Sequence, residues 1–199
     1  MPRGVRRASA LVLFGLAALT PQGAGAKILD GSQSLAPGHI GAALGAELSL
    51  EDPNPIRLEV KERVGLAGGL DLYLDQTIGL HREDGVRLGG GLKWTALSLS
   101  TKRGRPGIAV WGGGFFHTQR EVAGAAFTAL VDYRFGALRP YAALDLDLWF
   151  EDGVDTRLTI LGGTRIAIVN HLGAYIEVGG GLTGRVRNHL VALGLRLDL

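Results

Sequence analysis

The chain has 199 residues, 46% of them hydrophobic, and its formal net charge at pH 7 is +2. This length suits a single domain. The chain contains no cysteine, which excludes a disulfide framework. The charge gives no support to a nucleic-acid partner, because three arginines lie in an N-terminal leader; without them the charge falls from +2 to −1.

The leader has the plan of a secretory signal peptide. A basic stretch, MPRGVRR, precedes the apolar stretch ALVLFGLAAL, and AGA at residues 24–26 is an A-x-A cleavage site. The apolar stretch is too short for a spanning helix, which needs about 20 apolar residues. We expect residues 1–26 to be cleaved, leaving residues 27–199 as one domain; a buried N-terminal helix is the alternative.

The rest of the chain alternates apolar and polar residues with a period of two, which is typical of β-strands. About ten such segments of nine or more residues follow one another, and eight or twelve strands are the alternatives. The pattern slips near Thr95, which predicts a β-bulge, and the facing of residues 107–119 is ambiguous. In chain order the segments are residues 39–50, 56–64, 70–81, 86–94, 107–119, 123–135, 141–150, 156–168, 173–184 and 189–199.

Short connections such as EDPNP, REDG and EDGVD separate these segments, so neighbouring strands are expected to be antiparallel. One face of nearly every segment is apolar, and the opposite face carries charges of both signs in near-equal numbers. A membrane barrel shows its apolar face to lipid and encloses its polar face. We therefore predict an all-β fold, a closed up-and-down antiparallel transmembrane β-barrel; a soluble β-sandwich is the alternative.

The predicted barrel has a narrow lumen lined by a network of charges, since unpaired charges there would be costly. In YAALDLDLWF, for example, Asp145 and Asp147 point inward, whereas Leu144, Leu146 and Leu148 face lipid. The residues predicted to form the lumen network are Glu47, Arg57, Glu59, Lys61, Asp71, Asp75, Arg87, Lys93, Asp132, Arg134, Asp145, Asp147, Arg157, Arg165, Glu177 and Arg196.

Several stretches resemble the small outer-membrane β-barrels of Gram-negative bacteria. RVGLAGGLDLYL is similar to their tight periplasmic turns, RFGALRPYAALDL and NHLGAYIEVGGGL repeat that plan, and VALGLRLDL resembles their C-terminal assembly signal. Members of the class usually end in an aromatic residue, whereas this chain ends in Leu199. The resemblance implies export by the general secretory route, a periplasmic N-terminus, and insertion into the outer membrane by the barrel assembly machinery. The lipid bilayer and lipopolysaccharide are then the expected partners.

No catalytic, cofactor-binding or metal site is predicted. GGGLTG matches a dinucleotide fingerprint but opens no helix. His81 and His117 are expected near the outer rim with several acids, which leaves a rim enzyme as a weak alternative. Phe115, Phe116 and Phe150 are expected to mark the outer membrane boundary. The inner boundary is assigned to Tyr133, Phe135, Tyr141 and Tyr175; aromatic residues scattered along the strands without forming belts are the alternative.

Three functions remain open. A charged and filled lumen favours a structural role, or passage of a small solute through a narrow pore. An apolar internal cavity favours a binding module for a small apolar ligand or lipid. A histidine beside a carboxylate in an open rim cleft favours an enzyme. The sequence names no oligomeric state.

Overall fold

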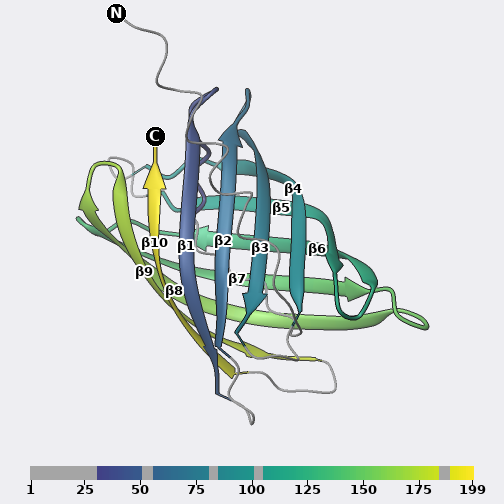
Figure 1. Ribbon diagram of the computed structural model, residues 1–199. Helices are drawn as coiled ribbons and strands as arrows, with labels where there is room; N and C mark the ends of the chain where they lie inside the picture. The colour runs from purple at the N-terminus through teal and green to yellow at the C-terminus, as the bar shows by residue number, and fades with distance from the viewer. Residues whose placement is uncertain (1–30, 51–55, 81–84, 101–104, 184–188) are drawn as a thin grey trace, which may run out of the picture.

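The computed structural model describes residues 31–50, 56–80, 85–100, 105–183 and 189–199. Ten antiparallel strands close into a barrel, as predicted (Figure 1). Each strand pairs with its neighbours in sequence, and β1 pairs with β10 to close the wall. The strands are β1 (Ile40–Ser49), β2 (Ile56–Gly65), β3 (Leu70–Gly79), β4 (Val86–Leu97), β5 (Gly107–His117), β6 (Val122–Asp132), β7 (Leu138–Trp149), β8 (Asp155–Val169), β9 (Leu172–Gly181) and β10 (His189–Asp198).

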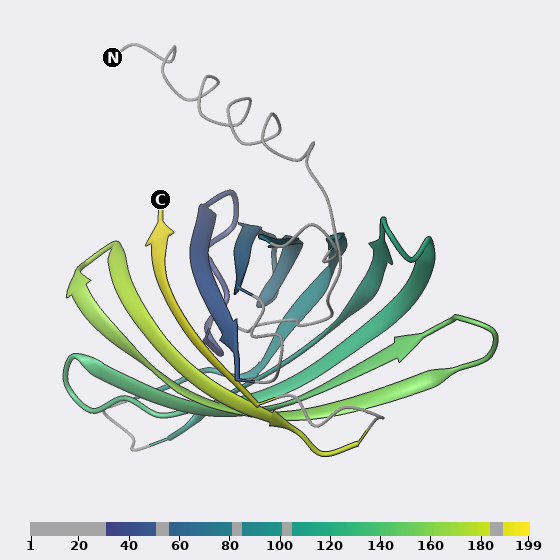
Figure 2. The ribbon, with the colours of Figure 1, turned by 60° about the horizontal axis from the view of Figure 1, so that its bottom comes forward.

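The barrel has two ends, which we name from the strands. The terminal rim is the end where β1 begins and β10 finishes, and the opposite end, where β1 leads into β2, is the outer rim. The two walls differ in direction, because β1–β3 run steeply across β7 and β8 (Figure 1). Figure 2 shows the strands curving around the interior.

Glycines allow the tight corner between β4 and β5. Gly91 pairs with Gly113, and Gly90 pairs with Gly114. A Cβ atom on Gly91 would overlap the backbone of Gly112, and a Cβ atom on Gly113 would overlap that of Gly90. Larger residues therefore do not fit where these two strands approach each other. The register between β4 and β5 shifts between Thr95 and Leu97, which confirms the predicted irregularity.

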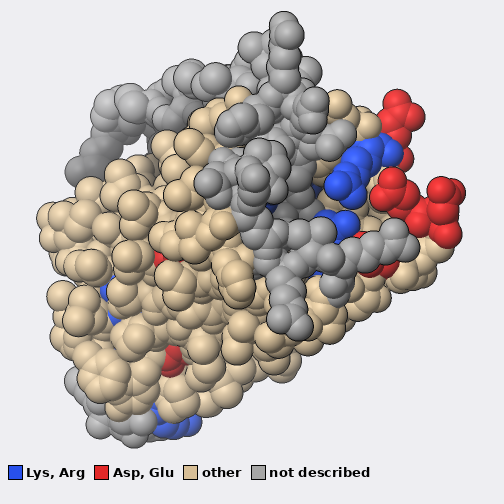
Figure 3. Space-filling view, turned by 90° about the horizontal axis from the view of Figure 1, so that it is seen from below, with Lys and Arg blue, Asp and Glu red and all other residues tan. Residues whose placement is uncertain are grey.

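The two faces of the wall have opposite character, as expected for a transmembrane barrel. Leucine, isoleucine, valine and aromatic side chains lie exposed on the outside, whereas most arginines and acids of the strands are buried inside. In Figure 3 much of the visible barrel surface is neither acidic nor basic, and acidic side chains gather toward one end. In β7, Asp145 and Asp147 are buried, while Leu144 is exposed and Leu146 and Leu148 are half-buried, so the predicted facing is correct.

The predicted signal peptide, residues 1–26, lies outside the described residues. Among the residues that the structure describes, no helix is long and apolar enough to cross a membrane.

Candidate functional site

The lumen is the candidate site, and ion pairs occupy it toward the outer rim. Arg57 of β2 donates from Nη1 to Glu47 of β1, with 3.0 Å between nitrogen and oxygen. Arg87 of β4 reaches across the lumen to Asp147 of β7, where Nη2 and Oδ1 are 2.9 Å apart. The Arg87 guanidinium also lies 3.9 Å from the centre of the Phe115 ring. Each pair compensates the cost of burying its charges.

Trp149, the last residue of β7, lies at the outer end of the lumen. Its side chain is fully buried, its ring makes an edge contact with Phe115 at 4.8 Å, and the ring of His117 lies 5.7 Å away. The guanidinium groups of Arg120 and Arg157 lie 5.6 and 4.6 Å from the Trp149 ring centre. These cation–π contacts place charge at the rim while the ring fills space below it.

Aromatic and polar groups fill the middle of the lumen. Lys61 lies 5.9 Å from the Tyr73 ring and 5.8 Å from the Trp111 ring. The Tyr141 hydroxyl donates to the buried carboxylate of Glu177, and the Thr128 hydroxyl donates to Asp145. These contacts supply acceptors and donors to groups that are shielded from water, as buried polar groups require.

A second set of ion pairs lies near the terminal rim. Asp71 of β3 is 3.2 Å from Arg63 and 3.8 Å from Lys93. Asp198 of β10 contacts three arginines, with nitrogen-to-oxygen distances of 3.3 Å to Arg63, 3.5 Å to Arg165 and 2.7 Å to Arg196. Asp198 therefore joins β2, β8 and β10 across the lumen.

The segment before β1 crosses the terminal mouth of the barrel. We call residues 31–36 the strap. Ser32 is fully buried and hydrogen-bonds to Asp132 of β6, and the Leu35 N–H donates to Asp71 of β3. The strap carbonyls accept hydrogen bonds from strands β2 and β4. The strap therefore adds a second layer of protein at this end of the lumen.

Most of the predicted lumen residues lie inside the barrel. Eleven are buried: Glu47, Arg57, Glu59, Asp71, Arg87, Lys93, Asp132, Asp145, Asp147, Glu177 and Arg196. Four more are half-buried: Lys61, Asp75, Arg157 and Arg165. That these side chains act together as a functional network stays a prediction.

The predicted lumen position of Arg134 is wrong. The strand pattern placed it in the lumen, but β6 ends at Asp132 and Arg134 is exposed in the following turn, where its Nε donates to the Gly136 carbonyl. Arg139, which lies between the predicted segments 123–135 and 141–150, is buried in the lumen, because β7 begins at Leu138. Its Nη2 is 2.6 Å from the Asp132 carboxylate.

The predicted positions of three aromatic residues are also wrong. Phe115, Tyr141 and Tyr175, expected at the membrane boundaries, are buried inside the barrel. Phe115 belongs to the segment of ambiguous facing, and glycine runs leave that ambiguity unresolved in the sequence. Phe116 and Phe135 do lie on the outside.

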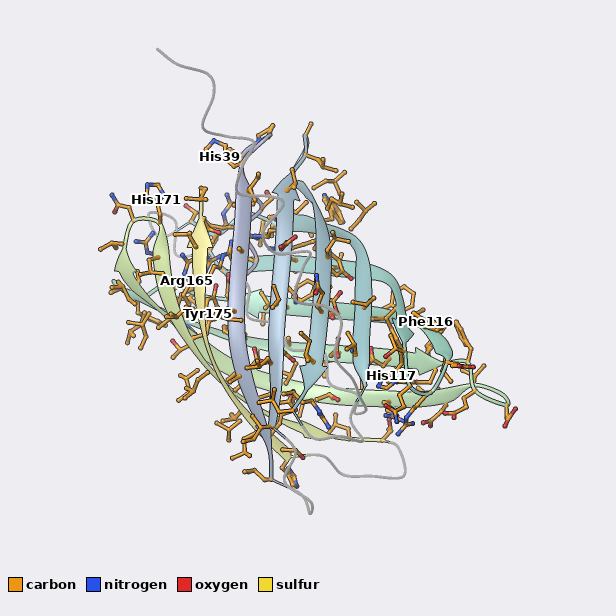
Figure 4. The ribbon with its side chains drawn as sticks, viewed as in Figure 1. His39, Phe116, His117, Arg165, His171 and Tyr175 are labelled. Carbon is orange, nitrogen blue, oxygen red and sulfur yellow. The ribbon has the colours of Figure 1, made fainter. Side chains whose placement is uncertain are left out.

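The histidines do not build an open cleft in the described part of the barrel. Figure 4 shows His39 and His171 toward the terminal rim and His117 toward the outer rim. His117 is fully buried, and its Nδ1 accepts a hydrogen bond from the Arg120 N–H. His81 lies outside the described residues. Within the described ranges, no three histidine or acidic side chains gather as metal ligands.

The comparisons with known proteins identify no family. No model of a known protein family matches the sequence, and no curated protein matches it. Similar solved structures include a de novo designed transmembrane β-barrel, with 11% identity, a TM-score of 0.43 and coverage of 83% of this chain and 99% of that chain. The N-terminal β-barrel domain of Pseudomonas aeruginosa OprF has 11% identity, a TM-score of 0.43 and coverage of 83% and 100%.

The Yersinia pestis outer membrane protein Ail in a phospholipid nanodisc has 12% identity, a TM-score of 0.41 and coverage of 81% of this chain and 99% of that chain. None of these structures assigns the chain to a specific family.

Proposed function

We propose that the protein is an integral β-barrel of a Gram-negative outer membrane, with a structural role in the envelope and no permanently open channel. The groups that occupy the lumen carry this proposal. Ion pairs and aromatic rings occupy its outer and middle parts, and the strap crosses its terminal mouth. A barrel of about eight strands is just filled by its own side chains, and in this one of ten, long arginine and aromatic residues take up part of the additional room.

The surroundings of the barrel follow from its surface. Exposed leucine, isoleucine and valine side chains on all ten strands require an apolar environment. The lipid bilayer and lipopolysaccharide are therefore the proposed partners, with the barrel assembly machinery acting during insertion. The outer-rim connections that the structure describes, residues 118–121 and 150–154, are short, which argues against a large receptor surface.

Conductance tests the closed lumen. The protein refolded into planar bilayers is expected to show no steady ion current, because ion pairs, aromatic rings and the strap lie in the outer, middle and terminal parts of the lumen. A general porin of known open conductance, reconstituted in the same way, serves as the positive control. A stable open level in most insertions would contradict a structural role and favour the narrow-pore alternative.

Export is tested by the mass of the protein. We expect the protein recovered from cell envelopes to begin at Lys27, because the leader has a basic stretch, an apolar stretch and an A-x-A site. Intact-mass spectrometry distinguishes this product from the full chain. Retention of Met1 in the membrane-inserted protein would exclude cleavage.

A binding module for an apolar ligand or lipid is the second candidate. One apolar hollow of about 500 Å³ supports it, lined by residues that include Leu92, Trp94, Val110, Phe127 and Leu144. These side chains point outward, toward the bilayer. The hollow arises where Gly112 and Ala129 leave space between larger residues. Its position suits a lipid acyl chain, whereas an internal ligand would need a cavity inside the lumen.

A further inference from the structure

We propose that the terminal mouth of the barrel is a binding site for an extended peptide, and that the chain's own strap occupies this site and closes the lumen. The proposal goes beyond a structural role, because it assigns a ligand class to the mouth and makes its closure reversible. It rests on the hydrogen bonds that hold the strap, on the shape of the wall beneath it, and on the distribution of charge between the two.

The mouth holds the strap largely by its backbone. Lys93 Nζ donates to the carbonyls of Gly31 and Gln33, and the Thr95 hydroxyl donates to the Ser32 carbonyl at 2.6 Å. Arg63 donates to the Gln33 carbonyl at 3.1 Å. In the other direction, two strap N–H groups donate to carboxylates: Ser32 to Asp132 at 2.8 Å and Leu35 to Asp71 at 2.9 Å. Hydrogen bonds to charged groups are stronger than neutral ones, so the mouth provides strong partners for peptide groups.

Ser32 is the side chain that anchors the strap. Its hydroxyl donates to Asp132 Oδ1 at 2.7 Å and accepts from Arg139 Nη2 at 3.2 Å. Arg139 also donates to the amide oxygen of Gln33 at 3.1 Å. The anchor therefore involves β6 and β7, on the wall opposite β2. The strap spans the mouth between these strands instead of following one edge.

The wall is shaped to admit the strap. A Cβ atom on Gly107, the first residue of β5, would overlap the Ser32 hydroxyl as well as Asp132. A Cβ atom on Gly65, the last residue of β2, would overlap the Ala36 carbonyl and the Leu35 side chain. Neither glycine has a backbone conformation that L residues avoid. The space that these glycines leave is therefore occupied by the strap, and is not required by a turn.

The closure is reversible because the strap is uncharged and the charged residues of the mouth pair with one another. The strap sequence, GSQSLA, carries no charged side chain, whereas the mouth contributes Asp71, Asp132, Arg63, Lys93 and Arg139. The mouth charges also pair with one another, as Asp132 does with Arg139 and Asp71 does with Arg63. When the strap leaves, no charge loses its ionic partner, and water at the rim replaces the strap's hydrogen bonds. Strap release is therefore compatible with an intact barrel.

Thiol protection tests the position of the strap. The chain has no cysteine, so Ser34→Cys, at a half-buried strap position that leaves the Ser32 anchor unchanged, provides a single reporter in the full-length protein. We expect this thiol to react slowly with a membrane-impermeant maleimide in the folded barrel. Adding Gly107→Ala should raise the rate by about tenfold or more, since the new methyl group displaces the strap and its hydrogen bonds.

Gly162→Ala is the matched control, because a Cβ atom there meets nothing within 4 Å. It should leave the labelling rate at position 34 unchanged. Thr95→Val is a second, milder variant, which deletes the hydroxyl that donates to the Ser32 carbonyl and should raise the rate several-fold. Equal rates in the reporter protein and in both the Gly107→Ala and Thr95→Val variants, with heat-dependent gel mobility retained, would overturn the strap assignment.

A free peptide tests the ligand class. A peptide with the sequence of residues 27–38, added in millimolar excess, should compete with the strap and raise labelling at position 34. A control peptide with proline at the positions of Ser32 and Leu35 lacks the two N–H donors and should compete less. Failure of the first peptide to compete, or equal competition by both, would overturn the peptide site. Protection of position 34 in a barrel that nevertheless conducts would refute both the structural role proposed above and the closure of the lumen by the strap, and would leave only the peptide site standing.

Discussion

Asp147→Ala is expected to lower the free energy of unfolding by about 3–5 kcal/mol, because it leaves a buried cation without its partner. Arg87 is 1% exposed, and its Nη2 lies 2.9 Å from Asp147 Oδ1. Among the described residues, Nε and Nη1 of Arg87 have no hydrogen-bond partner. Asp147 therefore supplies the one hydrogen bond found for this guanidinium there. Urea unfolding of the barrel in vesicles, followed by tryptophan fluorescence, measures the change.

Asp155→Ala is the matched control. Asp155 also pairs with an arginine, Arg157, at 3.1 Å, but its side chain is 43% exposed at the outer rim. Its loss should cost at most about 1 kcal/mol, as for other exposed pairs. Replacing both Arg87 by Met and Asp147 by Leu should recover much of the stability that Asp147→Ala loses. Equal costs for the two single alanine variants would contradict the view that buried pairs hold the lumen.

The strand pattern was sufficient to predict the barrel and the facing of most residues. Alternation in β7 placed Asp145 and Asp147 opposite Leu144, and the structure has this arrangement. The reason is physical: successive side chains of a strand point to opposite faces, so one charged face and one apolar face determine the orientation. The short connections predicted antiparallel neighbours, because a short turn can join only strands that run in opposite directions. The slip near Thr95 was visible because a bulge interrupts the alternation.

The partners across the lumen could not be predicted. Arg87 and Asp147 are 60 residues apart in sequence and belong to strands that are not neighbours in the wall. Their contact depends on the diameter and flattening of the barrel, which alternation does not determine. The facing of β5 was likewise hidden, because Gly112, Gly113 and Gly114 carry no side chain to mark a face.

Element boundaries caused the error at Arg134 and Arg139. Alternation alone extends β6 through Arg134, but the chain turns after Asp132, and Gly136 has a positive φ of 60° in the connection to β7. Arg139 then enters the lumen and pairs with Asp132. The strap was missed for a different reason. Residues 31–36 have no alternation and no charge, so only the complementary groups of the folded mouth show where they bind.

Leu144→Arg is expected to destabilise the membrane-inserted barrel by about 2–4 kcal/mol, the cost of an arginine on the lipid face at the bilayer midplane. Leu144 is 47% exposed on the outside of β7 and pairs with Ala129 and Ile160 near the middle of the neighbouring strands. No acidic residue of β7 shares its face, since Asp145 and Asp147 point inward. Unfolding in vesicles of defined lipid composition measures this cost.

Leu138→Arg separates the effect of depth from the effect of the substitution itself. Leu138 is also 47% exposed on the outer face, but it is the first residue of β7, at the terminal rim. An arginine near the membrane interface should cost about 0–1 kcal/mol. Because both leucines have the same exposure on the same strand, a soluble protein would tolerate the two arginines equally. A difference of 1–3 kcal/mol or more between them, present in vesicles, is therefore the signature of a bilayer around the middle of the barrel; equal costs would place Leu144 in water and contradict the transmembrane assignment.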